Sequence, residues 1–339
     1  MVQTSVRVKR AQPRPRDRLD GLIGRLTLRV RACSRRLGDP VDSYLHVGTG
    51  TLRLSIDEAR FDQLVRAAGS RDQLQRVVEG LSQELQLEYA DFASVKGTVV
   101  LPGSTVKGNV RARLELSFAP SEGSVRSCLI RASDEPLEPP SPREHGWRHF
   151  KIWSEALGFA REPACDYTEE EEGVCLLCDI FGTAGLQGLV GFSDLAGEHL
   201  QLKAIELPTG EKLSVAPPGS TFTGSATFTN LKDWELGLLL LGMGLRESRL
   251  GRPVLLGKVK YRRYPNYIFG VVRYEVSRLE LSNFSESLEI EGMHVESGSR
   301  VEGEILDKLV HALVGRARDE LGEELLDVDE VGRLERLEA

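Results

Sequence analysis

The sequence predicts an α+β protein with a ferredoxin-like core, helical insertions and a zinc-bearing lobe. Two observations predict the core: strand-like and helix-like segments alternate along the chain, and turn residues separate them. Their order is strand, long insertion, helix, inserted segment, strand, helix and further strands, which suits a ferredoxin-like arrangement. A third observation predicts the lobe, because three cysteines fall between residues 165 and 178.

The first elements follow from local patterns. Residues 1–18 are rich in proline and arginine and are expected to be flexible. Leu22 to Val30 alternates apolar with basic residues, which is typical of a strand. Residues 57–88 have helical spacing of apolar residues and predict an inserted helical pair. Gly97 to Leu101 is short and extended, and the Pro102-Gly103 break follows it.

The later elements follow from the same patterns. They are a helix that Ser104 or Thr105 caps and that runs to about Phe118, a helix over 147–159, a strand over 222–228, a helix over 231–245 that ends at Gly242 and Gly244, strands over 254–261 and 271–281, and an amphipathic helix over 302–325.

Together the elements divide the chain into seven parts. These are a basic flexible N-terminus (1–18), a first core part (19–56), a helical insertion (57–90), a second core part (91–118), an insertion lobe with the zinc site (119–180), a third core part (181–285), and a C-terminal helix with an acidic tail (286–339).

The charge of the chain is unevenly distributed. The 339 residues carry a net charge of −7, yet residues 1–36 contain eleven Lys or Arg and two Asp. Because screening limits each charge to a reach of about 10 Å, a local basic surface can bind phosphates on an acidic protein. No apolar run is long enough to span a membrane, and the N-terminus lacks the apolar region of a secretory signal. We therefore expect a cytoplasmic protein without a membrane partner.

The cysteines indicate a metal site. Cys165 precedes the pair Cys175 and Cys178, whose CxxC spacing suits two thiolate ligands of one zinc ion. His149, His145 or Cys128 is the fourth ligand, and we favour His149 because the apolar residues beside it could dock it. Four protein ligands leave no open position, so this zinc would be structural. The alternative is that the cysteines are small buried hydrophobic residues.

The segment LPGSTVKGNVR, from Leu101 to Arg111, joins a sharp turn to the start of a helix. Free backbone N–H groups and the side chain of Lys107 at a positive helix end suit a phosphate. The spacing excludes a Walker A loop. The alternative is an ordinary capped helix on the surface.

Four motifs resemble those of the RAMP superfamily, the repeat-associated proteins of type III CRISPR complexes. LPGSTVKG is similar to its IPGSSLKG signature, and LHVGTG at Leu45 to Gly50 is similar to its turn after the first strand. CLLCDIFGTAG at Cys175 to Gly185, with VGFSDL at Val190 to Leu195, is similar to its third block. The glycine-bearing loop from Gly242 to Val259 stands where the family has a Gly-rich loop.

Among these proteins, the chain most resembles the backbone subunits of Csm-type complexes. The resemblance implies a ferredoxin-like, modified RNA-recognition fold, with several copies that bind single-stranded guide RNA beside other subunits of the complex. The expected RNA contacts are Arg25, His46, Ser104, Lys107, Arg111, Arg246, Arg249, Arg252 and Lys258. For His46, a packed position inside its turn is the main alternative.

The resemblance also implies a catalytic residue. In the backbone subunits an acidic residue before the IPGSS turn cuts target RNA, and Asp91 stands at that place here. Such a carboxylate can help hold a divalent metal such as Mg²⁺ against a phosphate. The alternative is that Asp91 only caps or solvates its loop.

Two further functions compete with this one. The chain could be a non-catalytic RAMP subunit that caps one end of the complex, or a zinc-stabilised scaffold that binds only protein. Salt-dependent binding to a single-stranded oligonucleotide separates the RNA-binding functions from the scaffold.

Overall fold

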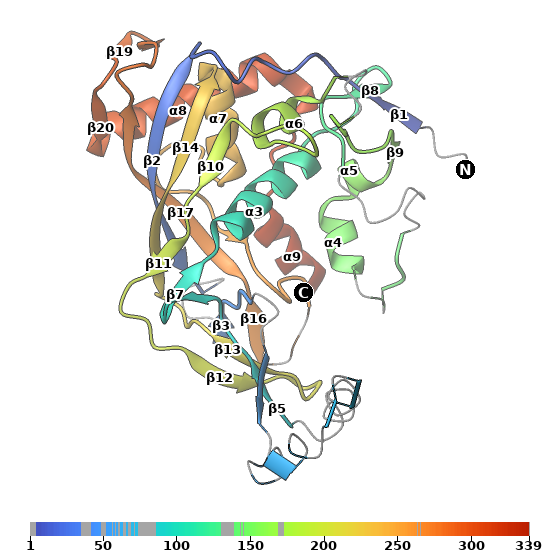
Figure 1. Cartoon of the computed structure of the whole chain (residues 1–339). Helices are drawn as coiled ribbons and strands as arrows, with labels where there is room; N and C mark the ends of the chain where they lie inside the picture. The colour runs from blue at the N-terminus through green and yellow to red at the C-terminus, as the bar shows by residue number, and fades with distance from the viewer. Residues whose placement is uncertain are drawn as a thin grey trace.

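The α+β class is confirmed in the computed structural model of the chain (Figure 1). The structure describes residues 5–34, 42–48, 52–55, 86–129, 139–142, 144, 146–168, 173–262, 264 and 266–338, with isolated positions between 57 and 73. Its main element is a nine-stranded sheet, counted over those residues, in which all pairings are antiparallel.

Three long strands form the centre of this sheet. They are β2 (Leu22–Ala32), β14 (Thr221–Leu231) and β17 (Val271–Leu281), in the order β17-β2-β14. Along β2, Leu26, Leu28 and Val30 are buried, whereas the arginines between and beside them are exposed. The predicted alternation is confirmed, and it gives the sheet one apolar face and one polar face.

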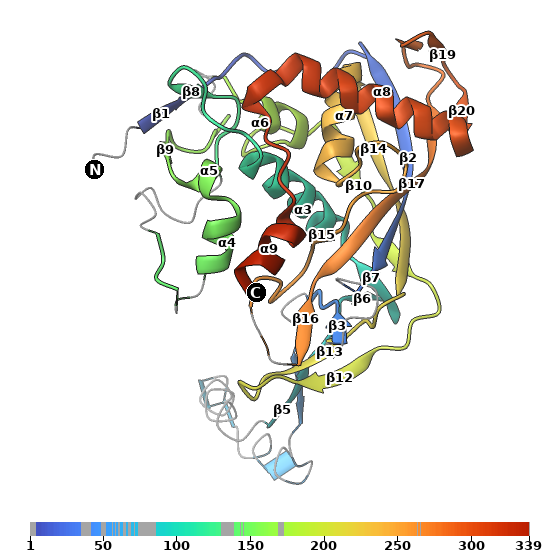
Figure 2. The same ribbon diagram turned by 180° about the vertical axis from the view of Figure 1, so that it is seen from behind.

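Three helices cover the apolar face (Figures 1 and 2). They are α3 (Gly103–Leu116), α7 (Asp233–Gly242) and α8 (Gly303–Leu321). Helices α7 and α8 approach closely at Gly237, where a Cβ atom would lie 1.9 Å from the carbonyl oxygen of Leu313. Any side chain at this position would separate the two helices.

Shorter strands complete the sheet. They are β6 (Ser94–Val95), β7 (Thr98–Leu101), β10 (Val190–Phe192), β11 (Leu195–Gly197), β15 (Val254–Leu255) and β20 (Arg300–Glu302). Along the chain the main elements follow in the order β2, α3, β11, β14, α7, β17, and the sheet runs β17-β2-β14-β11-β7.

A lobe of short elements packs beside α3. It contains β8 (Ser124–Val125), α4 (Trp147–Ile152), α5 (Ser154–Leu157), β9 (Ala160–Arg161) and α6 (Leu176–Phe181). The helix expected over 147–159 is broken at Trp153, whose ψ of 27° departs from helical geometry. The Trp153 ring is buried, and its indole N–H donates to the Tyr261 hydroxyl at 3.3 Å.

The N-terminal segment differs from the flexible one expected over residues 1–18. Strand β1 (Ser5–Val8) pairs in parallel with both β8 and β9. Beyond it, the guanidinium groups of Arg14 and Arg16 each lie 2.7 Å from a carboxylate oxygen of Asp179 on α6. Two of the arginines that suggested disorder are thus paired with a carboxylate more than 160 residues away.

The segment after α8 was expected to be an acidic tail, but it contains a further helix. Helix α9 (Glu330–Glu338) packs on α4 and buries Val331 and Leu334. At its start the buried carboxylate of Glu330 lies 2.9 Å from the buried guanidinium of Arg113 on α3. A buried ion pair and an apolar face therefore fix the C-terminal helix in place.

Smaller sheets lie at the periphery. One contains β4 (Leu52–Ser55), β5 (Gln86–Ala90), β12 (Lys203–Glu206) and β13 (Lys212–Val215); others pair β3 (Asp42–Tyr44) with β16 (Tyr267–Phe269), and β18 (Leu288–Ile290) with β19 (Met293–Val295). Most of the predicted helical insertion over 57–90 lies outside the described residues, and its end is strand β5. In the described part of the chain, no helix is long and apolar enough to cross a membrane.

Candidate nucleic-acid interface and cysteine cluster

The start of α3 is held by a distant carboxylate. The backbone N–H of Gly103 donates to Oδ1 of Asp194 at 2.8 Å, and no side chain at the helix start forms a capping hydrogen bond. The expected cap by Ser104 or Thr105 is therefore absent. A Cβ atom at Gly103 would lie 2.2 Å from the carbonyl oxygen of Phe192, so this turn requires glycine. The LPG turn and the VGFSDL segment form one joint.

Helix α3 presents two functional edges. Ser104, Lys107 and Arg111 lie three and four residues apart and share one edge. Lys107 is half-buried, and burial, together with the charge of Arg111, lowers the pKa of its ammonium group. The carboxylate of Asp194 already accepts a hydrogen bond from the first turn of α3. The positive group that remains at this edge is therefore the ammonium group of Lys107.

Arg111 has an internal role. Its guanidinium donates to Glu115 Oε1 at 2.7 Å, to the carbonyl oxygen of Gly182 at 2.6 Å and to Sγ of Cys178 at 3.2 Å. It therefore connects α3 to the end of α6, where the last carbonyl groups of a helix favour a cation. These partners replace the RNA contact that the sequence suggested.

A cleft of about 520 Å³ lies along the second edge of α3. Its lining comes from four segments: His46 to Gly48, Ala90 and Asp91, the α3 residues Thr105, Gly108, Asn109 and Ala112, and Leu256 to Lys258 with Lys260. Three of the four segments belong to the LHVGTG, LPGSTVKG and glycine-loop motifs. Motifs that are far apart in the sequence thus converge on one surface.

His46 is part of the cleft wall and is 1% exposed. Its Nδ1 lies 2.7 Å from the carbonyl oxygen of Ser214, and its ring meets the edge of Phe92 with centroids 6.1 Å apart. Burial lowers the pKa of His46. The packed alternative describes this residue better than the RNA contact does.

The polar groups of the cleft include one carboxylate and two lysines. Asp91 is half-buried, and Lys258 is 49% exposed beside the carboxylate of Glu211. Lys260 places its Nζ 3.4 Å from the carbonyl oxygen of Leu255, and burial lowers its pKa to about 8. The sequence singled out Asp91 and Lys258. The lowered pKa of Lys260 arises from tertiary burial, which the sequence does not show.

The other predicted RNA contacts lie outside the cleft. Arg246 and Arg252 lie 2.8 and 3.5 Å from carboxylate oxygens of Asp327, and the Arg246 side chain is 11% exposed. Arg249 faces Asp307, and Arg25 lies 2.6 Å from Glu280. Arg246 is therefore structural, whereas Arg25, Arg249 and Arg252 are 39–54% exposed and can still reach a ligand.

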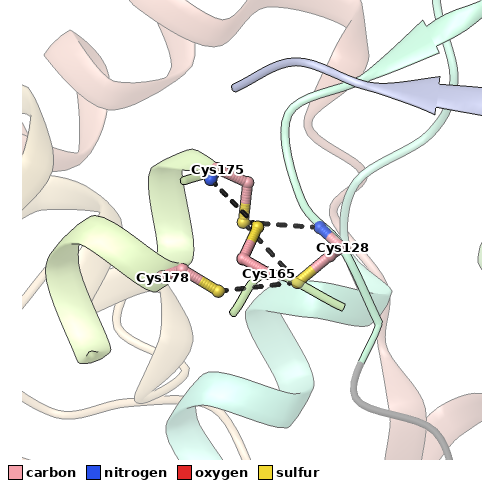
Figure 3. A group of neighbouring side chains, drawn as sticks. All are labelled: Cys128, Cys165, Cys175 and Cys178. Atoms are coloured by element: carbon pink, nitrogen blue, oxygen red, sulfur yellow. Dashed lines mark hydrogen bonds between the residues drawn. The ribbon is translucent and has the colours of Figure 1, made fainter. Parts of the chain in front are cut away.

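Four buried cysteines form a cluster beside α3 (Figure 3). Their sulfur atoms all lie within 4.8 Å of one another; the residues are Cys128, Cys165, Cys175 and Cys178. The shorter separations are 3.5 Å between Cys128 and Cys178 and 3.7 Å between Cys128 and Cys175. A tetrahedral zinc ion with Zn–S bonds of about 2.3 Å places its sulfurs about 3.8 Å apart. The donor set and its dimensions therefore fit a metal such as zinc.

Backbone and side-chain donors surround these sulfurs. The N–H of Cys175 donates to Sγ of Cys165 at 3.2 Å, and Arg111 donates to Cys178. Donors of this kind stabilise the thiolate form that a metal requires.

The preference for His149 as the fourth ligand is corrected by this geometry. Cys128 joins the other three cysteines, whereas the ring of His149 packs against Tyr261 with centroids 4.8 Å apart. Phe150, Ile152 and Trp153 do lie in an apolar cluster, but that cluster is a separate one that also includes α9. His145 lies outside the described residues.

Comparison with known proteins identifies the family. The model of the RAMP superfamily matches residues 40–313. The chain belongs to the RAMP superfamily. A search of curated protein sequences found no match to this RAMP protein. Among solved structures it is similar to Csc2 from Thermofilum pendens, with 14% sequence identity and a TM-score of 0.33, over 94% of this chain and 82% of that one.

Proposed function

We propose that this RAMP protein is an RNA-binding backbone subunit of a CRISPR effector complex. It binds single-stranded guide RNA mainly through the phosphate backbone, with little sequence preference. The observation that carries the proposal is the convergence of three family motifs on the cleft beside α3. The fourth motif supports the same helix, through Asp194 at its start and Cys178 at Arg111.

Both edges of α3 would contact the RNA. Gly108 lies on the surface, and a Cβ atom added to it would meet no heavy atom within 4 Å, so a ribose-phosphate chain can pass close to the helix there. Lys107 stands on one side of it and Lys258 on the other side of the cleft. An ammonium group that is already partly desolvated, as at Lys107, binds a phosphate more strongly than a fully hydrated one.

Fluorescence anisotropy with a labelled single-stranded RNA tests this proposal. We expect Lys107→Gln and Lys258→Gln each to weaken binding about three- to tenfold and to lower the log–log salt slope by about 0.7, the value for one phosphate contact on a single strand. Lys212→Gln is the matched control, because Lys212 is also 49% exposed and also faces a glutamate. Equal affinities for all three variants and the unmodified protein would contradict the proposal.

We further propose the Csm-type role, in which several copies bind side by side on one RNA. The number of chains bound should then rise with RNA length, as measured by analytical ultracentrifugation. A stoichiometry of one chain at every length favours the end-capping subunit. Absence of binding at low salt favours the protein scaffold.

Cleavage of target RNA is a conditional part of the proposal, supported by the position of Asp91 in the cleft. There Asp91 would help hold a divalent cation such as Mg²⁺, which polarises a phosphate when bound. Lys260 lines the same cleft, and its lowered pKa suits proton transfer near neutral pH.

The test uses the protein loaded with guide RNA and a complementary target. Asp91→Asn should abolish Mg²⁺-dependent cleavage, with a loss of about 100-fold or more, while guide binding is unchanged. Asp319→Asn, on the exposed side of α8, is the control. Undiminished cleavage by the Asp91 variant would end this part of the proposal.

We propose a structural zinc ion bound by Cys128, Cys165, Cys175 and Cys178, on the strength of their donor set and spacing. Mass spectrometry of purified protein should find one zinc per chain. Cys128→Ser should lower zinc content, whereas His149→Ala and Cys33→Ser should not. Zinc-free protein with four reactive buried thiols would reject the site.

We also propose that the sheet and its helices form the ferredoxin-like core. The order β2, α3, β11, β14, α7, β17, with β2 central between β17 and β14, is the support for this assignment.

A further inference from the structure

The polar face of the sheet carries a ladder of charged pairs between β2 and β17. Arg25 stands opposite Glu280 and Arg29 opposite Glu275, with N···O distances of 2.6 and 3.5 Å. The next pair breaks this rule, because Arg31 stands directly opposite Arg273. Like charges in directly opposed positions destabilise a sheet.

Neither arginine of this pair is neutralised by a described residue of the chain. Among the described residues, no carboxylate oxygen lies within the 4.0 Å of a salt bridge from either the Arg31 or the Arg273 guanidinium. The two carboxylates in the lining of the same hollow already serve other arginines, since Glu275 on β17 faces Arg29 and Asp307 on α8 faces Arg249. The pair therefore presents two uncompensated positive charges.

These charges lie in an open hollow of about 880 Å³. The charged groups in its lining are Arg29, Arg31, Arg249, Arg273, Glu275 and Asp307, which sum to +2. Cys33 lies in the same lining. Burial raises the pKa of its thiol, whereas the charges of Arg31 and Arg273 lower it, so both guanidinium groups lie close to this thiol. Among the described residues that line the hollow, none is aromatic.

We propose that Arg31 and Arg273 form a second phosphate-binding site, which takes a phosphodiester group of single-stranded RNA. Two adjacent guanidinium groups match the oxygens of a phosphate in forked hydrogen bonds. Thr221 stands opposite Arg31 on β14 and adds a hydroxyl to the same face. Because no ring is available to stack a base, the contact is to the backbone and carries no sequence preference.

The site extends the RNA path beyond the cleft, and it rests on the proposed RNA-binding function. Arg249, which belongs to the glycine-bearing loop and was predicted to contact RNA, also lines this hollow. The hollow lies on the polar face of the sheet, opposite the face that α3 covers, so it is a contact separate from the α3 cleft.

The test compares two variants that lose the same charge from the same sheet. Arg31→Gln/Arg273→Gln should weaken single-stranded RNA binding about tenfold and lower the log–log salt slope by about 1 to 1.5, as expected for two lost phosphate contacts. Arg278→Gln/Arg300→Gln is the control, because Arg278 pairs with Glu302 on neighbouring strands and neither residue lines the hollow. Equal salt slopes for the two double variants would overturn the site.

Two further measurements separate this site from the RNA-binding function and from a structural role. If the unmodified protein binds no RNA, inorganic tripolyphosphate remains a probe: it should raise the unfolding temperature of the unmodified protein but not of the Arg31/Arg273 variant. Without a ligand, that variant should unfold at the same or a higher temperature, since it relieves a repulsion. A tripolyphosphate effect that persists in the variant, or a lower unfolding temperature, would overturn the proposal.

Discussion

At the scale of single residues, burial separates the cations that can bind a ligand from those that hold the fold. Arg111, Arg113 and Arg246 are all largely buried, and each reaches carbonyl or carboxylate oxygens of distant segments. In the sequence they look like Lys107 or Lys258. The difference lies in tertiary partners, such as Asp327, which is 81 residues from Arg246.

The first prediction concerns His149. Burial, with help from the nearby charge of Lys260, lowers its pKa to about 4. An unfolded histidine has a pKa of about 6.5, so the unfolded chain takes up this proton first as the pH falls from 6.5 to 4. We expect the free energy of unfolding to fall by about 1–3 kcal/mol across that window, as measured in urea.

Two variants check the assignment to His149. His149→Phe keeps an aromatic ring against Tyr261 and should flatten the pH dependence. His311→Gln, on the exposed side of α8, should leave it unchanged. A dependence that persists in His149→Phe would assign the proton to another group.

The second prediction concerns the buried pair of Arg113 and Glu330. Glu330→Gln should cost about 3 kcal/mol of unfolding free energy, because it leaves the Arg113 charge buried without its partner. Glu280→Gln breaks the exposed pair with Arg25 and should cost about 1 kcal/mol or less. Equal costs would contradict the ranking of the two pairs by burial.

At the scale of elements, the sequence predicts helices and strands where local signals dominate. The alternation in β2 and the Pro102-Gly103 break before α3 are such signals, and both elements are confirmed. Two features could not be predicted, because each depends on a residue far away in the sequence. The start of α3 is bound by Asp194, and the folded conformation of the N-terminal segment depends on Asp179. The cysteine cluster was predicted from three members, but Cys128 is 37 residues before Cys165 and carries no local signal.

The third prediction concerns the N-terminal segment. Asp179→Asn weakens the ion pairs with Arg14 and Arg16, so this segment should detach more often from α6. Trypsin should then cleave after Arg18, which leucine follows, several times faster than in the unmodified protein. Asp319→Asn provides the comparison, and unchanged cleavage would mean that other contacts, such as the β1 pairing and the ion pair of Arg14 with Glu235, hold the segment.

At the scale of the whole molecule, the cysteine-bearing part of the lobe and the sheet share one core. The four cysteines belong to the same buried cluster as the sheet residues Leu26 and Phe222 and the helix residue Leu313. The sequence suggested a separate lobe, because its short and irregular segments show no periodicity that ties them to the sheet. Contacts between α3 and α6 join the two parts.

The fourth prediction follows from this shared core. A strong chelator should lower the unfolding temperature of the entire chain in a single transition, because loss of the proposed zinc ion would disturb the core that the sheet also uses. Circular dichroism and tryptophan fluorescence should report the same midpoint. The Cys33→Ser variant should respond as the unmodified protein does. Two separate transitions would instead indicate that the lobe unfolds by itself.

The bond between Gly103 and Asp194 has a consequence for protein engineering. The residues that start α3 are 91 positions apart, so neither segment works as a transferable cassette. A chimera that takes its LPG turn from one relative and its VGFSDL segment from another keeps this helix start only if both parents have the glycine and the aspartate. Grafting between RAMP proteins should therefore exchange the two segments together.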